Sequence, residues 1–159
     1  MLKPVIAYID GGARGNPGPA GYGVSIETVD GHTIDELRGT IGIATNNSAE
    51  YHALIAALQY LVEKNTQHAV IRSDSQLLTR QMRGDYKVKH PELQKLYNKA
   101  SSLAEQLTDI EYEHIPREQN QRADRLANLA MDSITTPDKS RPGKTVETVR
   151  DQTAIHGIE

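Results

Sequence analysis

Hydrophobic and polar positions along the first part of the chain predict three strands. Residues 4–9 form a nearly continuous apolar run, which is typical of a buried strand. Residues 21–28 alternate between large apolar and small positions, as a half-buried strand does. Asp30-Gly31 is a strong hairpin signal, so a third strand is expected over about residues 33–43.

Beyond residue 47 the pattern alternates between helical and extended spacing. An amphipathic helix is predicted over residues 48–64, a short strand over 69–73, and a short helix that ends at Gly84. A second long helix carries its apolar face on Leu93, Leu96, Ala100, Leu103 and Leu107. The last two elements expected are a strand over 110–115 and a helix over 119–132.

The resulting order, β-β-β-α-β-α-α-β-α, predicts an α/β fold. An antiparallel meander followed by alternating strands and helices implies a mixed five-stranded sheet with helices packed on it, over residues 1–132. Residues 133–159 are polar, contain proline and are weakly patterned. They predict a tail that is either mobile or adds an edge strand.

Composition narrows the class of protein. The length of 159 residues suits one domain, with an aliphatic core because the only aromatic residues are seven tyrosines. The absence of cysteine excludes disulfides and a cysteine nucleophile, and it fits a cytoplasmic location. No apolar run is long enough to predict a signal peptide or a membrane span. Nothing in the pattern indicates more than a monomer.

Charge and motif searches exclude further classes. The net charge of −3 argues against a protein that coats DNA, but metal-binding carboxylates leave a nucleic-acid enzyme open. The glycine-rich stretch after residue 10 does not satisfy G-x-G-x-x-G, and an alternating strand follows it, so we interpret it as a turn. The chain has no G-x-S-x-G or HExxH motif, and its histidines lack paired metal-ligand spacing.

Four acidic residues stand where predicted elements begin or end. Asp10 ends the first strand and Asp74 ends the fourth. Glu50 lies in the first turn of the first long helix, and Asp124 lies near the start of the last. If strands one and four are parallel neighbours, Asp10 and Asp74 emerge side by side at the edge where open α/β sheets bind ligands.

Each of these acids also has a purely structural interpretation. Asp10 could open an Asx-turn, and Asp74 could cap the helix after it. Glu50 could belong to a capping box that starts at Asn47, and Asp124 could favour the helix dipole. Acids that converge on one edge, however, repel one another unless a cation neutralises them, and hard oxygen ligands favour Mg²⁺ or Mn²⁺ over zinc.

Four segments of the chain resemble the ribonuclease HI family (type 1 ribonuclease H). They read YIDGGARGNPGPAGYG, TNNSAEYHAL, RSDSQLL and REQNQRADRLANLA, in the order and spacing of that family. The resemblance spans about residues 5–131 and implies the ribonuclease H-like fold. It also implies endonucleolytic cleavage of the RNA strand of RNA/DNA hybrids with two Mg²⁺ ions, or Mn²⁺, held by the catalytic residues Asp10, Glu50, Asp74 and Asp124.

The resemblance also implies how the substrate is held. Backbone groups of Gly11, Gly12 and Ala13 are expected to approach the RNA, whose 2′-hydroxyls line a shallow minor groove. The family positions that contact groove edges or the backbone correspond to Asn16, Asn46, Asn47 and Gln76. Thr45 is expected to support a phosphate contact on the DNA strand. Helix capping is the alternative for Asn46 and Asn47.

Two departures from the family pattern concern catalysis and binding. Many members carry a histidine in a loop before the last acid, whereas His114 is expected to stay in the fifth strand. Arg117 resembles the residue of members that lack this histidine and would neutralise charge at the scissile phosphate, with a surface arginine as the alternative. Many members also insert a basic, Trp-rich handle, which is missing here.

Without a handle, Lys87, Lys89 and His90 form at most a reduced basic patch, and a solvated loop is the alternative. Weaker and steeply salt-sensitive substrate binding is then expected. The sequence therefore predicts a handle-less ribonuclease HI that leaves 5′-phosphate ends. The alternatives are a nuclease that also cuts double-stranded RNA, and a catalytically silent binding module, against which the four acids argue.

Overall fold

A computed structural model describes residues 3–135 of the chain, and the predicted tail lies outside these residues from position 136 onward. The predicted order of strands and helices is confirmed. The elements are β1 (Val5–Ala13), β2 (Gly18–Glu27), β3 (Thr33–Ala44), α1 (Asn46–Glu63), β4 (His68–Ser73), α2 (Gln76–Met82), α3 (Pro91–Ala104), β5 (Asp109–His114) and α4 (Gln121–Thr135), with a 3₁₀ turn at Arg117–Gln119 before α4.

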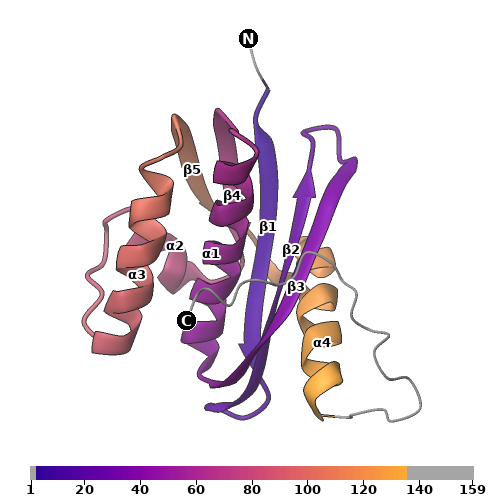
Figure 1. Cartoon of the computed structure of the whole chain (residues 1–159), viewed down its shortest axis with the longest axis vertical. Helices are drawn as coiled ribbons and strands as arrows, with labels where there is room; N and C mark the ends of the chain where they lie inside the picture. The colour runs from indigo at the N-terminus through magenta and orange to yellow at the C-terminus, as the bar shows by residue number, and fades with distance from the viewer. Residues whose placement is uncertain (1–2, 136–159) are drawn as a thin grey trace.

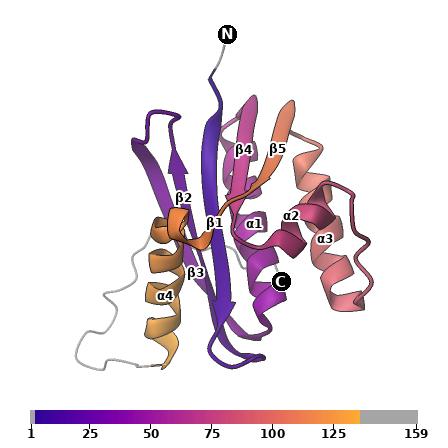
Figure 2. The same cartoon turned by 180° about the vertical axis from the view of Figure 1, so that it is seen from behind.

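The strands form the predicted mixed five-stranded sheet, and their spatial order is β3-β2-β1-β4-β5. β1 pairs antiparallel with β2 and parallel with β4, which itself pairs parallel with β5. Helices α1 and α3 cover one face of the sheet, and α4 covers the part of the opposite face formed by β1, β2 and β3 (Figures 1 and 2). β1 is therefore central, and elements from both faces meet at its carboxyl end.

The core between the sheet and α1 is largely aliphatic, as composition predicts. The helix predicted over residues 48–64 is α1, and its side chains Leu54, Ile55, Leu58 and Leu61 are fully buried. Tyr22 and Tyr51 are the large aromatic side chains buried with them. No helix within residues 3–135 has both the length and the apolar character required to cross a bilayer.

The first hairpin corrects the sequence prediction. The glycines after Asp10 continue β1 to Ala13, and residues 11–13 pair with residues 20–22 of β2, so the turn is confined to residues 14–17. Glycine is required at position 11 for packing, since a Cβ there would lie 2.1 Å from the carbonyl oxygen of Ala49 in α1. The prediction stopped the strand early because glycine is rare in strand interiors.

Close packing of α4 on β2 fixes the other face of the sheet. A Cβ on Gly23 would lie 2.4 Å from the carbonyl oxygen of Ala123 and 2.5 Å from Cβ of Leu126. Gly23 pairs with Asp10 in the β1–β2 register. The same contact thus brings the first turn of α4 to the strand that carries Asp10.

Replacing Gly23 with alanine should therefore destabilise the protein. The methyl group meets helix backbone, so α4 must shift, and we expect a loss of about 1–3 kcal/mol in the free energy of unfolding by urea. Gly12→Ala is the matched control, because its Cβ would meet only ordinary contacts at 3.7 Å or more. Equal stability of the two variants would contradict this account of the α4 contact.

Candidate active site

Three acids from three elements converge at the carboxyl ends of β1 and β4. Asp10 lies in β1, Asp74 directly follows β4, and Glu50 lies in the second turn of α1. Each offers a carboxylate oxygen within 4.8 Å of those of the other two. The parallel register places Ile9 beside Ser73, so Asp10 and Asp74 are the next residues along neighbouring strands.

Helix α1 brings Glu50 to this edge by resting on the glycines of β1. The Gly11 amide donates to Oε1 of Glu50 at 3.3 Å, and the missing side chain at position 11 leaves room for the backbone of Ala49. A single glycine thus both admits the helix and holds the carboxylate of Glu50 beside Asp10.

Asp124 and Arg117 approach from the segment after β5. Asp124 lies in the first turn of α4, near enough to Asp10 to raise the pKa of that carboxyl. Arg117 lies in the 3₁₀ turn before α4, and its charge acts on both Asp10 and Glu50. The other three predicted acids and the predicted arginine therefore all lie close enough to act on Asp10.

The electrostatics of the cluster favour bound protons or a bound cation. Burial, followed by the charge of Asp74 and the contact with Asp124, raises the pKa of Asp10 to about 8, against a smaller lowering by Arg117. Burial, followed by the charges of Asp10 and Asp74, raises the pKa of Glu50 well above its usual range. Carboxylates whose mutual repulsion is only partly offset by Arg117 fit a hard divalent cation such as Mg²⁺ or Mn²⁺.

Asn120 is a part of the site that the sequence analysis missed. Its buried side-chain amide donates to the carbonyl oxygen of Ile9 at 2.8 Å and to Oδ2 of Asp74 at 3.2 Å. Its Oδ1 is buried without a hydrogen-bond partner among the described residues. Asn120 therefore ties β1 to Asp74 just before α4, and only its position four residues before Asp124 could have indicated this.

Helix capping, the alternative interpretation of several of these residues, is contradicted at four of them. Thr45 caps α1 through a bond from the Ser48 amide, so neither Asn46 nor Asn47 is the cap. Glu50 consequently lies beyond the first turn, outside a capping box. Ser75, rather than Asp74, caps α2.

Asp10 does not open a turn either, because it lies inside β1 and β1 continues for three residues beyond it. Asp124 does lie in the first turn of α4, where a negative charge favours the helix dipole. That structural role is compatible with its contact to Asp10.

The residues proposed for substrate contact form a polar strip beside the acids. The Ala13 amide donates to Oδ1 of Asn46 at 2.9 Å, and the Asn46 amide donates to Oδ1 of Asn16 at 3.0 Å. These bonds join the β1–β2 hairpin, which includes Gly11 and Gly12, to the start of α1. The exposed Asn47 follows in the first turn of α1.

The remaining predicted contacts lie further along the chain. Gln76 is the exposed first residue of α2, two positions after Asp74. Lys87 and Lys89 are exposed in the connector between α2 and α3. A groove of about 440 Å³ lies there, lined by Gly84, Tyr86, Lys87, Val88, Gln94, Tyr97 and Asn98.

Two sequence expectations about the family's departures are met. His114 is the last residue of β5 and pairs with Ser73, so it belongs to the strand. Only residues 83–90 separate α2 from α3, and no further helix is inserted between them. The connector is thus too short for a helical handle.

Comparison with known proteins identifies relatives over most of the chain. Residues 8–130 match the protein family described as reverse transcriptase-like. The chain is 52% identical over 130 residues to the bifunctional protein Rv2228c of Mycobacterium tuberculosis, covering 81% of this chain and 36% of that protein. It is 44% identical over 128 residues to ribonuclease HI of Halobacterium salinarum, covering 80% of this chain and 64% of that protein.

Solved structures share the fold. The N-terminal RNase H domain of Rv2228c, solved as a fusion with maltose binding protein, superposes with a TM-score of 0.81 at 49% identity, over 84% of this chain and 97% of that chain. LC11-RNase H1 in complex with an RNA/DNA hybrid superposes with a TM-score of 0.80 at 44% identity, over 83% of this chain and 99% of that one.

The raised pKa of Asp10 predicts how stability depends on pH when metal is removed. Between the unfolded value of 3.8 and about 8, the folded protein holds a proton that the unfolded chain releases. The free energy of unfolding in chelator should therefore fall as the pH rises through this window. At pH 7, Asp10→Asn should raise it by about 1–3 kcal/mol, because the amide needs no proton.

Thermal unfolding from pH 4 to pH 8, with chelator or excess Mg²⁺, measures this effect. With Mg²⁺ the wild-type trend should reverse, since protons compete with the cation for the carboxylates. A wild-type protein whose stability in chelator is constant or rises across this range would contradict the electrostatic description of the site.

Proposed function

Since this chain belongs to the ribonuclease HI family, we propose that it is a metal-dependent endonuclease that hydrolyses the RNA strand of RNA/DNA hybrids and leaves 5′-phosphate ends. The observation that carries the proposal is the cluster of Asp10, Glu50 and Asp74 at one sheet edge, with Asp124 beside it. A similar ribonuclease H1 bound to an RNA/DNA hybrid supports the substrate.

The four carboxylates are proposed to hold two Mg²⁺ ions, or Mn²⁺, in the substrate complex. The charges of Asp74 and Asp124 both act on Asp10, so Asp10 would contribute to holding both ions. When bound, such ions activate a water and stabilise the leaving 3′-oxygen. The repulsion and burial that raise the pKa of Asp10 and Glu50 support a cation as the partner that the cluster requires.

The remaining side chains of the site orient these acids and balance their charge. The Gly11 amide holds Glu50 in place, so that its second oxygen is free to approach the 2′-hydroxyl of the cleaved ribose. The guanidinium of Arg117, which already acts on Asp10 and Glu50, is proposed to neutralise charge at the scissile phosphate. Asn120 keeps Asp74 beside β1.

Specificity for RNA is proposed to come from the strip beside the acids. The backbone of Gly11, Gly12 and Ala13 borders the site without large side chains, so a sugar can approach closely. Asn16 and Asn46 are fixed by hydrogen bonds to neighbouring backbone, which prepares their remaining polar atoms for the minor groove. The same proposal assigns groove or backbone contacts to Asn47 and Gln76, and a DNA phosphate contact to Thr45.

The wider context of the protein is also part of the proposal. Residues 1–132 would be the catalytic domain of a monomer, and the cysteine-free composition favours the cytoplasm. The chain spans only 36% of the Rv2228c protein, so activities of that longer protein are not carried over.

Cleavage of end-labelled substrates tests the proposed function. RNA/DNA hybrid, single-stranded RNA, double-stranded RNA and duplex DNA would each be incubated with Mg²⁺, Mn²⁺ or chelator. We expect cleavage of the RNA in the hybrid alone, lost in chelator and reduced by at least about a hundredfold in Asp74→Asn. Asp85→Asn, which removes a carboxylate from the exposed connector, is the matched control and should keep full activity.

Other outcomes would favour the alternatives. Cleavage of double-stranded RNA at a similar rate would indicate a broader nuclease. A folded protein that cleaves none of the substrates, with either metal, would contradict the catalytic proposal and favour a binding module.

The two connector lysines are proposed to contact phosphates in place of a handle. Lys87→Ala and Lys89→Ala should each weaken hybrid binding and lower the slope of log K against log salt by about one. Fluorescence anisotropy with the Asp74→Asn background in Mg²⁺ measures binding without cleavage. Lys64→Ala, at the opposite end of α1 from Glu50, is the control. An unchanged slope in both connector variants would leave the lysines as part of a solvated loop.

A further inference from the structure

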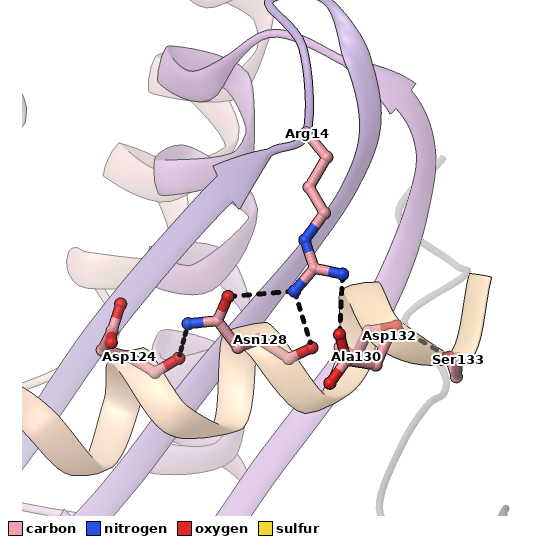
Figure 3. A network of polar contacts seen from close by, with 6 residues as sticks. All are labelled: Arg14, Asp124, Asn128, Ala130, Asp132 and Ser133. Atoms are coloured by element: carbon pink, nitrogen blue, oxygen red, sulfur yellow. Dashed lines mark hydrogen bonds and ion pairs between the residues drawn. The ribbon is translucent and has the colours of Figure 1, made fainter. Parts of the chain in front are cut away.

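Arg14 reaches from the first hairpin across to α4. It is the residue after β1, and its guanidinium lies over the C-terminal half of the helix (Figure 3). Nη1 donates to Oδ1 of Asp132 at 2.7 Å, and Nη2 donates to Oδ1 of Asn128 at 3.1 Å and to its carbonyl oxygen at 3.5 Å. These contacts join parts of the chain that are 118 and 114 residues apart in sequence.

The network continues from Asn128 to the acidic cluster. The side-chain amide of Asn128 donates to the carbonyl oxygen of Asp124 at 2.9 Å, as Figure 3 shows. Both polar atoms of the Asn128 side chain are therefore fixed. Its Oδ1 accepts from Arg14, and its Nδ2 donates to the turn of α4 that carries Asp124. Asp124 in turn lies in the first turn of α4, which packs on Gly23, the residue of β2 that pairs with Asp10.

The hairpin end of the network is also fixed. The Arg14 amide donates to the carbonyl oxygen of Pro19 at 2.8 Å, which closes the turn between β1 and β2. The preceding residue, Ala13, is bonded to Asn46 of α1. A movement of Arg14 relative to α4 would therefore be transmitted to the backbone strip of residues 11–13.

These contacts add little to the free energy of unfolding of the whole protein. The Arg14 and Asp132 side chains are 37% and 56% exposed, and surface ion pairs of this kind contribute about 0–1 kcal/mol. The planar guanidinium, however, binds three acceptors on two successive turns of α4, which fixes orientation more than it adds stability.

We propose that Arg14 is a positioning residue that clamps the β1–β2 turn to α4, and so sets Asp124 relative to Asp10 and to the strip of residues 11–13. The proposal rests on the proposed nuclease function and on Asp124 as a metal ligand. The competing role for Arg14, direct contact with a substrate phosphate, makes different predictions for Asp132.

Four proteins form the test: wild type, Arg14→Ala, Asp132→Ala and the double variant. Asp85→Ala is the control, because Asp85 also faces an arginine on the surface, Arg80 at 4.0 Å, with a similarly exposed side chain. The first measurement is a calorimetric titration with Mg²⁺ in the absence of substrate, which gives the Mg²⁺ concentration that half-saturates each protein. The second measurement determines kcat and KM separately for cleavage of the RNA/DNA hybrid.

If Arg14 acts as a clamp, both single variants should bind Mg²⁺ more weakly and lose kcat by a similar factor, on the order of tenfold. The double variant should be no worse than either single variant, because both changes open the same clamp. Arg14→Lys should restore part of the loss through a single donor. The free energy of unfolding in urea should differ little among all six proteins.

Several results would overturn the clamp. A raised KM with unchanged kcat in Arg14→Ala, together with a harmless Asp132→Ala, would indicate a phosphate contact. Losses that add in the double variant would indicate independent roles. If the wild-type protein cleaves no hybrid, the proposed function fails, but the metal titration still decides the clamp: equal Mg²⁺ affinity in wild type and Arg14→Ala would overturn it.

Discussion

The crowding of negative charge around Asp10 is the constraint on which the rest of the structure depends. A carboxylate that is 9% exposed and faces Asp74, Glu50 and Asp124 is unfavourable unless protons or a cation compensate it. The fold imposes this cost because β1 and β4 pair in parallel. This pairing places Asp10 of β1 beside Asp74, the residue that follows β4. A polypeptide selected for stability alone would have no reason to keep them.

Small residues and amides hold the repelling acids together. Gly11 admits α1 and binds Glu50, while Gly23 admits α4 with Asp124. Asn120 ties Asp74 to β1, while its own Oδ1 is buried without a hydrogen-bond partner among the described residues. Unsatisfied polar atoms are rare in protein cores, and their location at a functional site fits a structure that sacrifices some stability to fix its carboxylates.

Periodicity and spacing were sufficient to predict the order of elements and the mixed sheet, and they placed Asp74 and Asp124 at the boundaries where they lie. They failed where tertiary packing overrides local preference. Residues 11–13 were assigned to a turn although they continue β1. Glycine is needed at position 11 because the backbone of Ala49 in α1 packs against it, and a local sequence pattern does not show that contact. The roles of Asn120 and Arg14 depend on contacts more than 100 residues apart, which one sequence does not reveal.

The most direct test of the central claim is a calorimetric titration of the metal-free protein with Mg²⁺ near pH 7, in buffers of different ionisation enthalpy. If the crowded carboxylates hold protons until a cation replaces them, binding should release at least about one proton per chain, and fewer in Asp10→Asn. Binding without proton release, or no binding at millimolar Mg²⁺, would contradict the view that the cluster around Asp10 is built for a divalent cation.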